Sequence, residues 1–128
     1  MNIQALTNYE REHMPNLITL DFETFYDTGY GLNRLTTEEY IKSPQFQVIG
    51  VAIKVNDGTT TWYSGTREEL QKTLDAFSWD TSALLCHNMH FDGFILSQVF
   101  NITPSIYLDT LCMARALHGT NAGGSLKA

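Results

Sequence analysis

The sequence lacks any long hydrophobic run, and no apolar stretch approaches the roughly 18 residues that a membrane-spanning helix requires. Its first residues, MNIQALTNYERE, also lack the basic segment and the apolar segment of a secretory signal peptide. These two absences argue against export and against a membrane partner. We therefore predict a cytoplasmic protein.

Cysteine is scarce, because the chain has only Cys86 and Cys112, which lie 26 residues apart. No CxxC pair is present, and this argues against a disulfide framework. Each cysteine lies inside an apolar stretch, and cysteine prefers protein interiors. We predict two buried free thiols.

Positively charged residues are few, since the chain has 8 Lys and Arg residues against 14 Asp and Glu residues and its formal net charge is -6. This balance argues against a protein that holds nucleic acid through a broad basic surface. It does not exclude nucleic acid, because a metal-dependent nuclease concentrates carboxylates to bind cations. Two bound divalent ions would change the formal net charge from -6 to -2 (-6 + 4) and would place the added positive charge where a phosphate binds.

Internal repeats, low-complexity tracts and Pro/Ser-rich linkers are absent, so no domain boundary is visible. The 128 residues, 43% of them hydrophobic and 17% charged, have the composition of a globular protein. The chain is too short for a polymerase or helicase domain beside this fold. We predict one domain over residues 1–128.

Hydrophobic periodicity and turn signals predict alternating strands and helices. Two capping boxes, Thr36 with Glu39 and Thr66 with Glu69, mark helix starts. The predicted elements are strand 16–24, a short helix from Thr36 that ends before Pro44, a hairpin of strands 47–55 and 59–64, helix 66–77, strand 83–88, helix 91–100, strand 105–109 and helix 110–117 with Asp109 as N-cap. This order indicates an α/β fold whose mixed sheet is parallel in its later part.

The first candidate site is the pair Asp21 and Glu23 at the end of strand 16–24. Residues two apart on a strand point to the same face, so the two carboxylates lie close enough to share a cation such as Mg²⁺ or Mn²⁺. The alternative is a solvent-exposed acidic strand end with no ligand. Ligands in such sheets bind at the carboxyl ends of strands, which points to this pair, but a DxE pair taken alone favours the second interpretation.

The second candidate is Asp92, which opens an apolar helix after the strand at 83–88. It could instead be a carboxylate that stabilises the N-terminus of that helix through the helix dipole. A zinc site formed by Asp92 with His87 and His90 is a further alternative, although this spacing matches no usual structural zinc pattern.

Together these segments resemble a known family. LDFET (20–24), HNMHFD (87–92) and YLDTLCMARAL (107–117) are similar to the first two motifs of the DEDD-superfamily 3'-5' exonucleases, which share a ribonuclease-H-like fold. Residues 36–55 and 118–128 are similar to the proofreading domain of phage-type family-A DNA polymerases. The resemblance runs from about Leu17 to the C-terminus.

The resemblance implies a two-metal-ion 3'-5' exonuclease that hydrolyses DNA from its 3' end to nucleoside monophosphates. Asp21 would bridge two divalent cations, Mg²⁺ or Mn²⁺, Glu23 would ligate one of them, and Asp92 would complete the site through water or the other cation. The partners would be a single-stranded DNA 3' end and a polymerase domain or other subunit. The setting would be DNA replication by a bacteriophage in a bacterial host cell.

Four further residues are implied as substrate-binding. Asn88 matches the asparagine of the NxxxD motif, which in the family lies by the terminal nucleotide. Thr24 follows the DxE pair, and Phe22 and Phe91 flank the acids. For Phe91 a place in the core is an alternative, because aromatic side chains are usually buried.

The sequence departs from the family in its third motif, which would supply a fourth aspartate and a residue that orients water. No Asp or Glu follows Asp109, His118 fits a helix C-terminus better than a catalytic base, and Ser125 would cap a helix of only three residues. We expect a partial exonuclease domain, truncated before the last motif-bearing helix, with weak or no activity alone. The alternatives are a non-catalytic remnant that binds nucleic acid or a partner, and an endonuclease of the ribonuclease-H kind.

Overall fold

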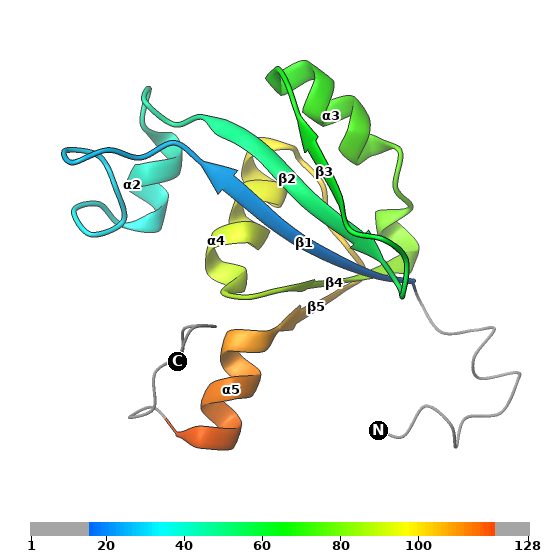
Figure 1. Ribbon diagram of the computed structural model, residues 1–128. Helices are drawn as coiled ribbons and strands as arrows, with labels where there is room; N and C mark the ends of the chain where they lie inside the picture. The colour runs from blue at the N-terminus through cyan, green and yellow to red at the C-terminus, as the bar shows by residue number, and fades with distance from the viewer. Residues whose placement is uncertain (1–15, 120–128) are drawn as a thin grey trace, which may run out of the picture.

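The computed structural model describes residues 16–119, which form a five-stranded sheet with flanking helices (Figure 1). The elements are β1 (Asn16–Thr24), α2 (Thr37–Lys42), β2 (Val48–Val55), β3 (Thr61–Ser64), α3 (Arg67–Asp75), the 3₁₀ turn η2 (Trp79–Thr81), β4 (Ser82–Cys86), α4 (Met89–Phe94), the π-helical turn η3 (Ile95–Val99), β5 (Ile106–Asp109) and α5 (Thr110–His118). The predicted order of strands and helices is confirmed. The similarity claimed for residues 120–128 and the cap proposed at Ser125 lie outside the described residues.

The strand order is β3-β2-β1-β4-β5, with β1 in the centre. β1 pairs with β2 antiparallel and with β4 parallel, β2 pairs with β3 antiparallel, and β4 pairs with β5 parallel. The first three strands therefore form a meander, and the crossovers through α3 and α4 return to parallel strands. This confirms the mixed α/β sheet predicted from the sequence.

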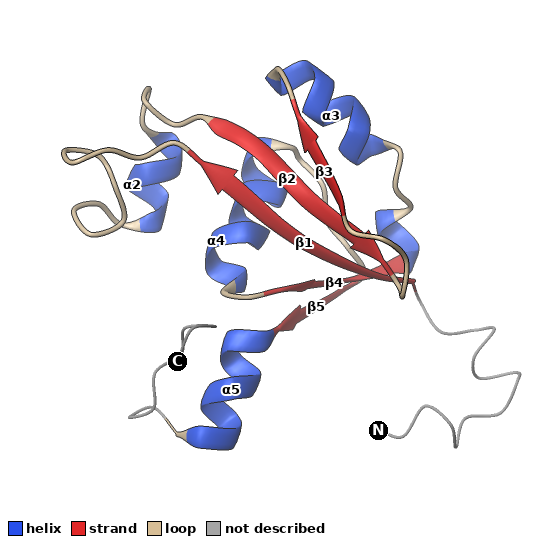
Figure 2. Cartoon of the chain, in the orientation of Figure 1, coloured by secondary structure: helices blue, strands red, loops and turns tan. Residues whose placement is uncertain are grey.

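The core lies on one face of the sheet, under α3 and α4 (Figure 2). Alternate residues of β1 point into it, since Ile18, Leu20 and Phe22 are buried while Asp21 and Glu23 are exposed. The other members that decide the packing are Val51 and Ile53 of β2, Leu70 and Leu74 of α3, Leu84 of β4, and Ile95, Leu96 and Phe100 after α4. The opposite face keeps the acidic side chains of β1 in solvent.

Local signals set the helix boundaries as the sequence indicated. In both predicted capping boxes the threonine hydroxyl accepts from the backbone N–H of the glutamate three residues on, and that glutamate accepts from the threonine N–H. One difference concerns the helix predicted at 91–100. It begins earlier, at Met89, and continues from Ile95 as a π-helical turn. A π-helical turn accommodates one extra residue in the helix.

The helix α5 differs from the others because none of its residues is buried. In Figure 1 it extends beyond β5, on the side away from α3. Cys112 on this helix is exposed, so the prediction that both cysteines are buried is wrong for Cys112 and confirmed for Cys86. Apolar residues on either side of a cysteine in the sequence indicate that it is buried only when its helix packs against another element, and α5 buries none of its residues. No helix between residues 16 and 119 is long and apolar enough to cross a membrane.

Candidate active site

The acidic pair of β1 lies on the sheet face opposite the core. Asp21 and Glu23 are both exposed and lie across from Ala52 and Gly50 of β2. Between Glu23 and Thr24 the pairing with β2 shifts register, which marks the point where β1 leaves the sheet. The prediction that the two carboxylates share one face is confirmed.

Asp92 reaches this pair because β1 continues beyond its pairing with β4. The last pair between the two strands joins Thr19 to Leu85, so the edge of β1 beyond that point is free of β4. There the Oδ1 of Asp92 accepts a hydrogen bond of 3.0 Å from the backbone N–H of Phe22, across 70 residues of sequence. α4 thus delivers a carboxylate beside the residue that separates Asp21 from Glu23.

The helix-dipole alternative for Asp92 agrees with its position, because Asp92 lies in the first turn of α4. The N-cap of α4 is Asn88, which has a left-handed backbone (φ 68) and makes no capping bond through its side chain. The carboxylate of Asp92 is in addition bound to the backbone of β1, a contact that a helix-dipole role alone does not require.

Burial and neighbouring charge act together on Asp92. Its side chain is only 4% exposed, and burial raises its pKa to about 7. The hydrogen bond from Phe22 lowers the pKa, while the charges of Asp21, Glu23 and Asp109 raise it further. Asp21, Glu23 and Asp92 therefore form one electrostatic cluster, with Asp109 nearby, and a bound cation would offset the repulsion within it.

The donors of this cluster are all carboxylate oxygens, the ligands that Mg²⁺ and Mn²⁺ prefer. In this respect the residues fit a hard divalent cation. Within residues 16–119 no group of three or more His, Cys, Asp and Glu side chains stands ready-made around a metal position. This finding applies to the acidic trio as well as to the zinc alternative.

The two histidines of the zinc alternative point elsewhere. The Nδ1 of His87 lies 2.8 Å from the hydroxyl of Thr110 at the start of α5. His90 lines a smaller cavity of about 260 Å³ between α4 and Tyr107. Neither residue faces the acidic pair with Asp92, so the structure gives the zinc alternative no support.

A cavity of about 760 Å³ opens beside Glu23. Three of the residues predicted to bind substrate, Phe22, Thr24 and Phe91, line it with Glu23. The remaining wall comes from Tyr40 of α2 and the loop after β1, namely Tyr26, Asp27, Thr28, Gly31, Leu32, Asn33 and Arg34. A pocket next to converging carboxylates is the default candidate for an active site.

Aromatic packing makes the wall of this cavity rigid. The ring of Tyr40 stacks on Tyr30, with centroids 4.6 Å apart, and approaches Phe91 at 6.0 Å. The Tyr40 hydroxyl lies 2.8 Å from that of Thr24 and donates to the carbonyl of Phe25. The half-buried Phe91 therefore belongs both to the core cluster and to the cavity wall.

Two predicted substrate-binding residues also make contacts within the fold. Phe22 lines the cavity but is buried, and its ring stacks on Phe100 in the core, with centroids 5.6 Å apart. Asn88 does not line the cavity. Its backbone N–H donates instead to Oδ1 of Asp109.

Asp109 joins two helices, which the sequence indicated only in part. It caps α5 by accepting from the N–H of Leu111, as predicted, and it also accepts from the N–H groups of Asn88 and Met89 at the start of α4. Burial alone would raise the pKa of Asp109, but the N–H groups of Met89, Leu111 and Asn88 outweigh it and hold the pKa below its ordinary value. The residue fixes the start of the helix that carries Asp92.

Comparison with known proteins supports the fold. No family model and no curated protein matches the sequence. Among solved structures, Brucella melitensis NrnC with bound Mg²⁺ aligns at 20% identity and a TM-score of 0.60, over 95% of this chain and 54% of its own. The same protein bound to pGG aligns at 21% identity and 0.58, over 95% and 53%. The apo form of a nuclease aligns at 17% identity and 0.59, with the same coverage.

At these identities the likeness shows a shared fold. The chain has the ribonuclease-H-like fold predicted from the sequence, and it spans about half the length of the solved structures it matches.

Proposed function

We propose that the chain is a divalent-cation-dependent 3'-5' exonuclease domain, which hydrolyses the terminal phosphodiester of a single strand and releases nucleoside monophosphates. The observation that carries the proposal is the hydrogen bond that holds the Asp92 carboxylate on the backbone of β1 between Asp21 and Glu23, with Glu23 lining a cavity. The fold is similar to that of solved nucleases, and this analogy supports the proposed activity.

Asp21, Glu23 and Asp92 would hold two divalent cations between them. When bound, such ions activate water and offset the charge that develops on the leaving oxygen. The chain's own contribution is orientation, since the Phe22 N–H holds Asp92 beside β1 and the strand presents Asp21 and Glu23 on one face. The Mg²⁺ bound in NrnC supports this assignment.

The cavity beside Glu23 would take the terminal nucleotide. Phe91 and the largely exposed Tyr26 offer aromatic faces for its base, and Arg34 offers a cation for phosphate. The pGG bound to NrnC supports a nucleic-acid ligand. The preference for DNA, the proofreading role beside a polymerase and the phage setting rest on the sequence resemblance.

A second candidate is a domain that binds a 3' end without cutting it. It is favoured by the lack of a ready-made three-ligand metal group within residues 16–119. Binding without hydrolysis would identify it.

The assay that separates these candidates uses a 5'-labelled single-stranded oligonucleotide, as DNA and as RNA, with the chain in molar excess. We expect slow shortening from the 3' end in Mg²⁺ or Mn²⁺ and none in EDTA, since the proposed cations are needed to activate water and residues 16–119 form no ready-made three-ligand group for them. A circular single strand is the control and stays intact. Cleavage of the circle would indicate an endonuclease, and binding of the linear strand without any cleavage would support the second candidate.

A further inference from the structure

We infer that the sheet face bearing Asp21 and Glu23 continues across β2 and β3 as a track for single-stranded nucleic acid, on which Trp62 stacks a base. The inference rests on the proposed function, because the track is taken to lead to the proposed cleavage site. Its physical basis is the register of the first three strands and the surroundings of Trp62.

Register places Trp62 on the acidic face. Asp21 pairs with Ala52 across β1 and β2, and Ala52 pairs with Trp62 across β2 and β3. Directly opposed residues of antiparallel strands point to the same side of a sheet. Asp21 and Trp62 therefore stand in one row, two strand spacings or about 10 Å apart.

The indole leans toward Glu23 within that face. Gly50 lies opposite Glu23, and a Cβ on Gly50 would lie only 2.4 Å from Cζ2 of Trp62. The six-membered ring of Trp62 thus covers the position where any other residue would place a side chain. A glycine here allows the ring to lie against the sheet, one strand away from Glu23.

Trp62 remains available for a ligand. It is 49% exposed, whereas the second tryptophan, Trp79, is buried and donates its indole N–H to the carbonyl of Leu74. A large aromatic face held beside carboxylates and open to solvent suits base stacking, which tolerates any sequence because every base has a π-face.

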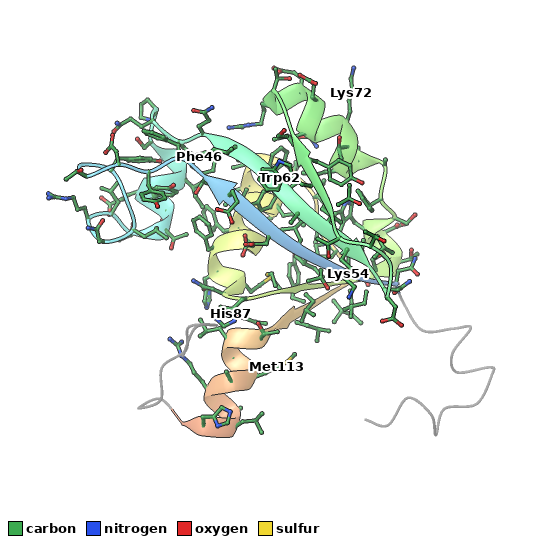
Figure 3. The ribbon with its side chains drawn as sticks, in the orientation of Figure 1. Phe46, Lys54, Trp62, Lys72, His87 and Met113 are labelled. Carbon is green, nitrogen blue, oxygen red and sulfur yellow. The ribbon has the colours of Figure 1, made fainter. Side chains whose placement is uncertain are left out.

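Lys54 adds positive charge to the same face. It lies opposite Thr19 on β1, two residues along β2 from Ala52 on the side away from Gly50, and Figure 3 labels it toward the end of β2. Within residues 16–119 Lys54 makes no ion pair, whereas Lys42 pairs with Glu38. The unpaired lysine and the exposed indole thus lie at two points of one face, so that a base can stack on the ring while the phosphate backbone passes the ammonium group.

The rest of this half of the face favours nucleic acid over a protein partner. Beside Trp62 the face carries Gly50, Ala52, Ser64 and Lys54, and Ile49 is the one exposed large aliphatic residue of β2, so these residues form no continuous aliphatic patch. Protein-docking surfaces usually present such a patch.

The test uses the full chain with Asp21→Asn, to prevent cleavage, and a labelled oligothymidylate of about twelve nucleotides in Mg²⁺. Binding is expected to quench tryptophan fluorescence, and Trp62→Phe is expected to abolish the quench because Trp79 is buried. Trp62→Ala is expected to raise the Kd by about 5- to 150-fold, and Trp62→Phe by much less because a phenyl ring still stacks. Met113→Ala is the control, since Met113 is similarly exposed but lies on α5 (Figure 3).

Binding by Trp62→Ala with the Kd of the parent, or a quench that survives in Trp62→Phe, would overturn the inference. A change in oligomeric state in Trp62→Ala without a change in Kd would overturn it in favour of a protein partner. These outcomes are independent of hydrolysis. A chain that binds and is quenched through Trp62 but never cuts contradicts the proposed function alone.

Discussion

Replacing Asp21 by asparagine is expected to lower the rate of 3'-end hydrolysis at least about 10²-fold while leaving the fold intact. The side chain is exposed on the open face of β1, so the substitution disturbs no packing. It removes one negative charge from the cluster that is proposed to hold the cations. Loss of such a ligand costs several kcal/mol of transition-state stabilisation, and about 1.4 kcal/mol corresponds to a factor of ten in rate. Single-turnover shortening of a 5'-labelled strand measures the effect.

The matched control is Glu68→Gln, which removes one exposed carboxylate from the first turn of α3, outside the acidic cluster. Its rate is expected to stay within about twofold of the parent, because a single distant surface charge is largely screened. Equal rates for Asp21→Asn and the parent would show that the acidic pair takes no part in hydrolysis.

Asp109→Ala is expected to destabilise the chain by about 2 to 4 kcal/mol in urea unfolding. The carboxylate accepts from the N–H groups of Asn88, Met89 and Leu111, and its removal leaves the first turns of two helices without their acceptor. Loss of a helix cap typically costs about 1 kcal/mol, and hydrogen bonds to charged groups cost more than neutral ones. Asp80→Ala, which removes an exposed acid from η2, is the control, with an expected change within about 0.5 kcal/mol.

The difference in unfolding free energy between the parent and Asp109→Ala is expected to depend on pH, because the pKa of Asp109 is lowered in the fold. Its ordinary value is 3.8 and the folded value lies below it, so the carboxylate stabilises the fold fully above pH 3.8. That contribution is lost as the pH falls through the folded pKa. The gap between the parent and Asp109→Ala is therefore expected to be present near neutral pH and to close in strong acid. A gap that is absent near neutrality would contradict the role assigned to Asp109.

Local signals were sufficient to predict most of the fold. The β-branched run at 16–24 coincides with β1, and the two Thr-x-x-Glu boxes begin α2 and α3. Each signal depends on residues within a few positions of one another, so the sequence contains all the information needed. The shared face of Asp21 and Glu23 was predictable for the same reason.

The rest of the site depends on contacts between distant segments. The bond from Phe22 to Asp92 joins residues 70 apart, and nothing near Asp92 distinguishes this role from helix capping. The cavity wall from Tyr26 to Arg34 lies in an irregular loop with no periodic pattern. The placement of Trp62 over Gly50 follows from the hairpin register, which places the two residues on neighbouring strands. Cys112 was misjudged because the exposure of α5 depends on packing rather than on composition.

The central claim is that the carboxylates of Asp21, Glu23 and Asp92 form a divalent-cation site, and calorimetric titration with Mg²⁺ and Mn²⁺ tests it most directly. The account predicts saturable binding by the parent chain and by Glu68→Gln, and its loss in Asp21→Asn and in Asp92→Asn. Asparagine at position 92 can still accept from the Phe22 N–H, so the fold is retained. Identical titrations of all four proteins would contradict the account.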